Sequence, residues 1–138
     1  MIYTVTMNPS LDYLLSLPAL QAGETNRSAA ERLVAGGKGI NVSKMLYNLG
    51  TDSIIWGFAG GFSGEELCRQ LTAAGLRQEL IFLHNGNTRI NVKLSAGQET
   101  EVNAKGPQAE EEALQIFYRR LEALTAEDYV CLLYTSDA

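Results

Sequence analysis

Residues 36–43, Gly-Gly-Lys-Gly-Ile-Asn-Val-Ser, combine a nearly bare backbone with one cation and one amide side chain. Glycines let backbone N–H groups approach a ligand closely, and the first turn of a helix offers unpaired N–H donors at the positive end of the helix dipole. Lys38 adds a full positive charge beside those donors. The stretch therefore predicts an anion-binding corner at the start of a helix, and a plain glycine turn before a core helix is the alternative.

Two familiar glycine motifs do not account for this corner. A P-loop requires Ser or Thr after its lysine and a glycine five residues before its second glycine. Here Gly39 follows Lys38, and no glycine stands five residues before Gly37. A dinucleotide-binding fingerprint that starts at Gly37 would need glycine where Val42 stands. The sequence therefore matches neither nucleotide motif.

Segments with helical spacing of apolar residues alternate along the chain with segments typical of strands. This order predicts an α/β fold with a parallel sheet. Val42, Met45, Leu46 and Leu49 recur at helical spacing and predict the core face of the helix after Lys38. A Ser63–Glu66 capping box predicts the start of a second helix, and Gly75 its end. We expect strands at 2–7, 53–58, 88–95, 99–103 and, fully buried, 128–133, and a third helix opening at Gly106-Pro107.

Two polar positions stand where ligands bind in such folds. Asp12 follows the turn after the first strand, and the crevice beyond strand carboxyl ends is the usual ligand site of an α/β sheet. A turn or capping aspartate is the alternative. The strand 88–95 places Arg89 and Lys93 opposite an apolar face with Ile90. That polar face could line a site, although such faces are more often simply solvated.

Composition limits the class of protein. The chain has 138 residues, of which 46% are hydrophobic and 20% charged, and its formal net charge is −5. This balance argues against nucleic acid or an anionic membrane as a bulk partner, and no segment reads as a membrane span, so the cytoplasm is expected. We expect Cys68 and Cys131 to be buried thiols, because their number and spacing fit neither a disulfide framework nor a metal site. We expect His84 to be a solvated loop residue.

The corner and its neighbours resemble a known family of sugar kinases. Residues 36–43, with Gly50 and Gly60 at the expected intervals, resemble the first signature of the phosphofructokinase B group within the ribokinase-like kinases. Segments in the same order resemble bacterial 1-phosphofructokinases, over about residues 1 to 130. They are Met1-Ile-Tyr-Thr-Val-Thr-Met-Asn-Pro-Ser-Leu-Asp12, Gly60-Gly-Phe-Ser-Gly64, Thr88-Arg-Ile-Asn-Val-Lys-Leu94, Thr100-Glu-Val-Asn103 and Gly106-Pro107. Tagatose-6-phosphate kinases share much of this pattern.

The resemblance implies a ribokinase-like fold and a sugar-phosphate kinase activity. The fold would be a parallel-sheet sandwich flanked by helices, with a small β lid, and residues 1–133 would form its N-terminal part only. Lid strands are expected at about 10–35 and 88–103, pairing with a second copy in a homodimer, and 134–138 would be a tail of doubtful origin. The full-length protein would use ATP and Mg²⁺ to convert fructose 1-phosphate to the 1,6-bisphosphate. Tagatose 6-phosphate as substrate, or a non-catalytic sugar-phosphate binding module, is the alternative.

The same resemblance implies roles for six residues. Lys38, Asn41 and Arg89 would hold the phosphate and hydroxyls of the substrate. Asp12, Gly37 and Asn103 would orient the sugar. The family's catalytic base is an aspartate in the half that this chain lacks, so we expect no catalytic residue and no metal ligand here, and the fragment alone is expected to be inactive. The sequence assigns no nucleotide-binding residue.

Overall fold

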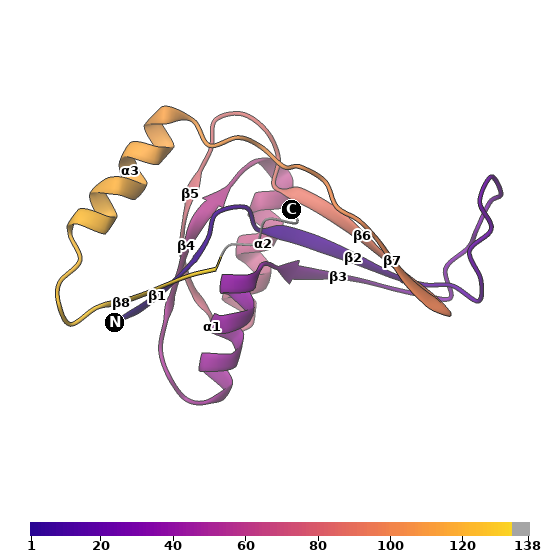
Figure 1. Cartoon of the computed structure of the whole chain (residues 1–138), viewed down its shortest axis with the longest axis horizontal. Coiled ribbons are helices and arrows are strands. Elements are labelled where there is room, and N and C mark those ends of the chain that lie inside the picture. The colour runs from indigo at the N-terminus through magenta and orange to yellow at the C-terminus, as the bar shows by residue number, and fades with distance from the viewer. Residues whose placement is uncertain (134–138) are drawn as a thin grey trace.

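The computed structural model describes residues 1–133, so the expected tail at 134–138 lies outside the described residues. Eight strands and three helices follow one another along the described chain (Figure 1). In order they are β1 (Ile2–Thr6), β2 (Ser10–Ser16), β3 (Ala30–Gly36), α1 (Lys38–Asn48), β4 (Ile54–Ala59), α2 (Gly61–Ala73), β5 (Arg77–Phe82), β6 (Arg89–Ala96), β7 (Gln98–Val102), α3 (Glu111–Glu122) and β8 (Tyr129–Leu132).

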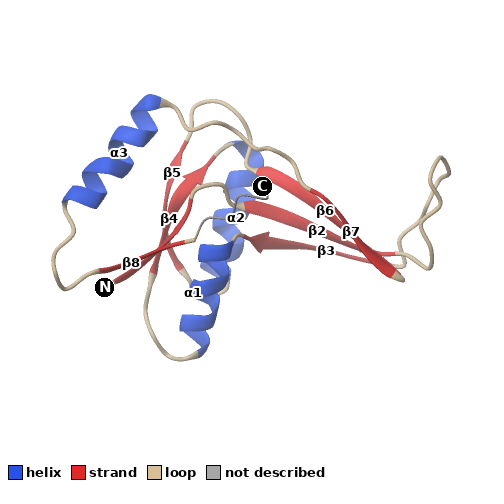
Figure 2. Ribbon diagram, viewed as in Figure 1, coloured by secondary structure: helices blue, strands red, loops and turns tan. Residues whose placement is uncertain are grey.

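The strands form two sheets. The first has the order β5-β4-β1-β8, and all of its strand pairs are parallel. α1 and α2 cover one face of this sheet and α3 covers the other, as Figure 2 shows. This arrangement confirms the predicted α/β class with a parallel sheet. The sequence pattern made no prediction for β5, which forms one edge.

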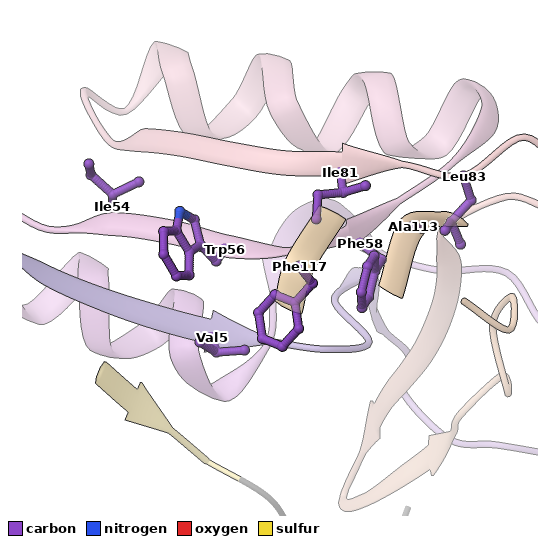
Figure 3. Close-up of a cluster of buried hydrophobic side chains, with 8 residues drawn as sticks. All are labelled: Val5, Ile54, Trp56, Phe58, Ile81, Leu83, Ala113 and Phe117. Atoms are coloured by element: carbon purple, nitrogen blue, oxygen red, sulfur yellow. The ribbon is translucent and has the colours of Figure 1, made fainter. Parts of the chain in front are cut away.

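The first sheet carries the core on both faces. β4 is buried along its whole length, and alternate side chains point to opposite faces. Ile54, Trp56 and Phe58 join Phe117 of α3 in one apolar cluster (Figure 3). Ile55 points the other way, into a second cluster with side chains of α1 and α2, which includes Ile40, Leu67 and Leu71. The hydrophobic effect therefore fixes helices on both sides of the same strand.

α1 presents a different face to the core from the predicted one. Its buried residues are Gly39, Ile40 and Ser43, whereas Met45 and Leu49 are 59% and 71% exposed. The Ser43 hydroxyl lies 2.7 Å from the hydroxyl oxygens of both Thr4 and Ser53. These buried hydrogen bonds and the small side chains beside them let the helix approach β1 closely. The apolar spacing alone therefore gave the wrong face.

Three further sequence predictions are wrong in detail. α2 begins at Gly61 without a side-chain cap, and Ser63 lies inside the helix, where its Oγ donates to the Thr88 carbonyl at 2.6 Å. α3 begins at Glu111 rather than at Gly106-Pro107. β8 forms where predicted but pairs only with β1, and Tyr129 is 71% exposed, so this strand is a sheet edge rather than a buried strand.

The second sheet has the order β3-β2-β6-β7 and projects away from the first (Figure 1). Its strand register separates polar from apolar side chains. Leu33, Tyr13, Val92 and Val102 form a row across the four strands on one face. Asp12 pairs in register with Asn91 on the opposite face. Within residues 1–133, no helix is long and apolar enough to cross a membrane.

Candidate functional site

The corner at the start of α1 is held against the end of β1. Gly37 has a φ of 137°, which side chains rarely adopt, and a side chain at Gly39 would lie 2.8 Å from the Val5 carbonyl oxygen. The backbone N–H of Ile40 donates to Thr6 Oγ1 at 3.1 Å. No side chain caps α1 and its first turn contains no acidic residue. The positive end of the helix is therefore open to an anion.

Asp12 of β2 stands beside this corner in a network of polar side chains. Its Oδ1 accepts hydrogen bonds from Ser10 Oγ at 2.7 Å and from Asn91 Nδ2 at 3.2 Å. The ammonium group of Lys93 lies 3.5 Å from Asp12 Oδ2. A side chain at Gly36 would displace the Asp12 carboxylate, so glycine leaves room for this network. The network fixes one carboxylate oxygen of Asp12 and leaves the other facing a cation.

Arg89 ties the loop after β1 to the segment after β7. Its Nε donates to the carbonyl of Asn8 and its Nη1 to the carbonyl of Ala104, both at 3.2 Å. The N–H of Ala104 donates to Asn91 Oδ1 at 3.0 Å. Side chains of β6 thus bind both the N–H and the carbonyl of Ala104, which fixes the neighbouring Asn103 at the site. These bonds use two of the five N–H donors of Arg89.

A cavity of about 280 Å³ opens between the corner and the polar face of the second sheet. All six residues expected at a site line this cavity, so the structure brings together positions separated by up to 91 residues in the sequence. The sequence pattern indicated the polar face of β6 but no role for Asn91 or Lys93, and it did not single out Ser10 or Glu101. The lining residues are Ser10, Asp12, Gly37, Lys38, Asn41, Arg89, Asn91, Lys93, Glu101 and Asn103.

The charge of the cavity is opposite to that of the chain. Lys38, Arg89 and Lys93 line it together with two carboxylates, which leaves one net positive charge in a chain of formal charge −5. The N-terminal end of α1 adds partial positive charge to the same wall. Such a cavity suits an anionic ligand that also carries hydroxyl groups, since Asp12 offers a carboxylate acceptor and two of the three lining asparagines, Asn41 and Asn103, offer amide donors and acceptors.

Side chains of both core helices hold the end of β3 next to the corner. Gln70 of α2 accepts a hydrogen bond from the N–H of Ala35 at 3.0 Å and donates to the carbonyl of Leu33 at 3.1 Å. Lys44 of α1 donates to the Ala35 carbonyl at 2.7 Å. Partial burial lowers the pKa of Lys44, and the nearby Asp12 carboxylate opposes this effect. These side chains satisfy the open edge of β3 and fix it to the core.

A second cavity, of about 530 Å³, adjoins the first and shares Gly37, Lys38 and Arg89 with it. Its other wall is mostly apolar and comes from α3 and β8, including Phe117, Leu121, Val130 and Leu132. Lys38 and Arg89 therefore stand where a polar cavity meets a larger apolar one. A ligand in the polar cavity could reach reactants that approach from this second side.

The remaining candidate residues lie outside the two cavities. His84 is exposed, and its Nε2 is 3.4 Å from Glu112 Oε2. Cys68 and Cys131 are free thiols that are half-buried, so the prediction of buried thiols is wrong in degree, and partial burial raises the pKa of Cys68. Among residues 1–133 there is no group of three or more side chains of the kinds that ligate metals. None of these residues adds chemistry to the site.

The sequence profile of one family matches most of the chain. This family is described as pfkB family carbohydrate kinase, and the match spans residues 5–133. The chain belongs to this family. The match includes each of the six expected site residues. The sequence-based assignment to the phosphofructokinase B group is therefore confirmed.

Proteins named 1-phosphofructokinase are similar over nearly the whole chain. A 1-phosphofructokinase of Bacillus subtilis is 42% identical over 132 residues, which are 96% of this chain and 43% of that protein. A 1-phosphofructokinase of Borreliella burgdorferi is 41% identical over 90% of this chain and 40% of that protein. A Staphylococcus aureus crystal structure assigned as a phosphofructokinase has a TM-score of 0.89 and 40% identity, covering 100% of this chain and 45% of that one. The chain thus spans less than half the length of these relatives.

Replacement of Gln70 tests whether its side chain holds β3. In Gln70→Met the buried N–H of Ala35 loses its acceptor, which costs about 1–3 kcal/mol and should speed its hydrogen exchange by roughly 5- to 150-fold. Amide exchange measured by NMR gives this rate. Arg69→Met is the matched control, because Arg69 makes only an exposed ion pair with Glu66. Exchange at Ala35 within twofold of the unmodified protein would contradict the assignment.

Proposed function

We propose that the full-length protein containing this chain transfers a phosphoryl group from ATP to a hydroxyl of a sugar phosphate, most specifically fructose 1-phosphate. Family membership and the names of the two curated relatives support this activity. The observation that carries the proposal is the polar cavity of about 280 Å³, which three cations and Asp12 line together. A sugar phosphate needs both anion contacts and a strong hydroxyl acceptor, and this cavity offers both.

Each lining residue has a role that its geometry allows. Lys38 and Arg89 would bind the phosphate, with Gly37 letting the backbone at the start of α1 approach it. Asp12 would accept hydrogen bonds from sugar hydroxyls, and Asn41 and Asn103 would donate to and accept from others. These residues bind and orient the substrate. In phosphoryl transfer, positioning and charge stabilisation supply most of the rate enhancement.

The divalent cation does not fit the donor groups of the described residues. Asp12 and Glu101 are the carboxylates of the polar cavity, and each faces Lys93. The described residues also contain no cluster of three metal-ligating side chains. We therefore propose that ATP, Mg²⁺ and the catalytic aspartate belong to the part of the full-length protein that this chain does not include. When bound, ATP would supply the γ-phosphoryl group.

We further propose that a second copy of the protein covers the apolar face of the second sheet. Leu33 and Val102 on this face are 40% and 61% exposed, and they belong to the apolar row that crosses all four strands. An exposed apolar sheet face marks an interaction site or an aggregation liability. The polar face remains available for the sugar, so the sheet would act as a lid on one side and as a dimer interface on the other.

Lys38→Met in the full-length protein tests the function. Loss of one cation paired with phosphate should cost about 1.5–3 kcal/mol, or roughly ten- to a hundredfold in affinity for fructose 1-phosphate. Affinity for a non-hydrolysable ATP analogue should stay within threefold. Titration calorimetry measures both, and Arg119→Met controls for the loss of an exposed cation on α3. If only the ATP analogue binds more weakly, the corner is a nucleotide site and the proposal fails.

An ADP-release assay on the unmodified full-length protein separates the alternatives. Turnover with fructose 1-phosphate is expected to exceed turnover with tagatose 6-phosphate. The reverse order would assign a tagatose-6-phosphate kinase. Binding of sugar phosphate without ADP release from any tested sugar would indicate the non-catalytic binding module.

Replacing Leu33 and Val102 together by Ser tests the dimer. Removing the exposed apolar side chains of Leu33 and Val102 should convert the full-length dimer to monomer at micromolar concentration. Sedimentation velocity measures this change. Leu20→Ser is the control, because Leu20 is also exposed but lies outside the sheet. A dimer that persists in the double variant would place the interface elsewhere.

A further inference from the structure

Lys93 is a cation of the polar cavity with two carboxylate neighbours. Its ammonium nitrogen lies 3.5 Å from Asp12 Oδ2 and 3.6 Å from Glu101 Oε1. Both distances exceed the ~2.7–2.9 Å of a tight charge-assisted hydrogen bond. The Lys93 side chain is 38% exposed, so water screens both ion pairs. Lys93 is therefore loosely held between two anions.

The other cavity cation of β6 is fixed by contrast. Arg89 donates to two backbone carbonyls, those of Asn8 and Ala104. In the part of the chain that the structure describes, Lys93 has its two ion pairs and no bond to a backbone group. Lysine also has a long, flexible stem that lets its ammonium group change partners. Of these two cations, Lys93 is the one that can move to a ligand.

Asp12 has only one carboxylate oxygen to offer a ligand. Ser10 Oγ and Asn91 Nδ2 both donate to Oδ1, which uses its two acceptor positions. A sugar hydroxyl that donates to Asp12 must therefore use Oδ2, the oxygen that Lys93 faces. Binding of the hydroxyl and the position of the Lys93 ammonium are coupled through this oxygen.

We propose that Lys93 makes the cavity selective for phosphorylated over unphosphorylated sugars, an inference that rests on the proposed function. In the free cavity Lys93 neutralises Asp12. A sugar phosphate draws the ammonium to its phosphate and so releases Oδ2 to a sugar hydroxyl. An unphosphorylated sugar must displace the ammonium from Oδ2 without offering another anion. The two ends of the substrate therefore bind cooperatively, and Lys93 is a specificity-determining residue.

The charge balance of the cavity supports this role. With Lys93 the lining residues carry three cations and two carboxylates. Without it the two remaining cations are matched by two carboxylates, and the net attraction for a phosphate group, which carries a charge of about −1.5 to −2 at neutral pH, falls. Glu101 pairs directly with Lys93 across β6 and β7 and keeps the ammonium in the cavity when no ligand is bound.

The test compares fructose 1-phosphate with fructose in the full-length protein by calorimetry, fructose being measured by competition. Lys93→Met should weaken fructose 1-phosphate binding about ten- to a hundredfold, while fructose binding is unchanged or improves by about two- to fivefold because Asp12 Oδ2 is released. Lys93→Arg should keep fructose 1-phosphate affinity within about threefold. Arg119→Met is the control for removing a distant cation. In an Asp12→Asn background, Lys93→Met should no longer improve fructose binding.

The outcomes separate this inference from the function on which it rests. Binding of fructose 1-phosphate by the unmodified protein, weakened about ten- to a hundredfold in Lys38→Met, supports the proposed function whatever Lys93 does. With that binding in place, the inference is overturned if Lys93→Met leaves fructose 1-phosphate affinity within threefold. It is also overturned if Lys93→Met weakens both ligands equally, because equal losses indicate general damage to the cavity rather than selection for phosphate.

Discussion

The site depends on a contact between α1 and β1 that only glycine allows. A side chain at Gly39 would meet the Val5 carbonyl oxygen, and one at Gly37 would press on the Thr6 side chain while the backbone holds a φ of 137°. Because both positions are bare, the first turn of α1 sits at the carboxyl end of β1, and the Ile40 N–H bonds to Thr6 Oγ1. The positive end of the helix, Lys38 and the loop into β2 therefore meet at one corner.

The second sheet completes the cavity from the opposite side and is fixed to the core at two places. Gln70 and Lys44 hold the end of β3. At the start of β6, Thr88 Oγ1 accepts from the N–H of Gly60 at 3.0 Å. Between these anchors, register places Asp12 and Asn91 on the same face. The polar face of this sheet lines the cavity, and the apolar row lies on the opposite face. A chain of net negative charge thus contains a cavity that is locally cationic.

The family resemblance named six residues that line one cavity, and their roles in binding stay predictions. The sequence pattern itself predicted the fold class, because glycine spacing and strand alternation are local signals. It did not predict which face of α1 is buried, since hydrogen bonds of Ser43 to distant hydroxyls and the bare Gly39 decide that packing. The alternation of β6 placed Lys93 on a polar face, but the same pattern fits a solvated strand. Only the tertiary pairing with Asp12 and Glu101 distinguishes the two. The Ser63 hydroxyl likewise found a tertiary acceptor in place of a helix cap.

A crystal structure of the full-length protein with fructose 1-phosphate tests the central claim most directly, namely that the corner before α1 and the polar face of the second sheet form one sugar-phosphate site. We predict phosphate oxygens within hydrogen-bond distance of the Lys38 and Arg89 side chains, and a sugar hydroxyl donating to Asp12 Oδ2. A sugar phosphate bound outside this cavity, or nucleotide phosphates on Lys38 in a complex with an ATP analogue, would contradict this arrangement.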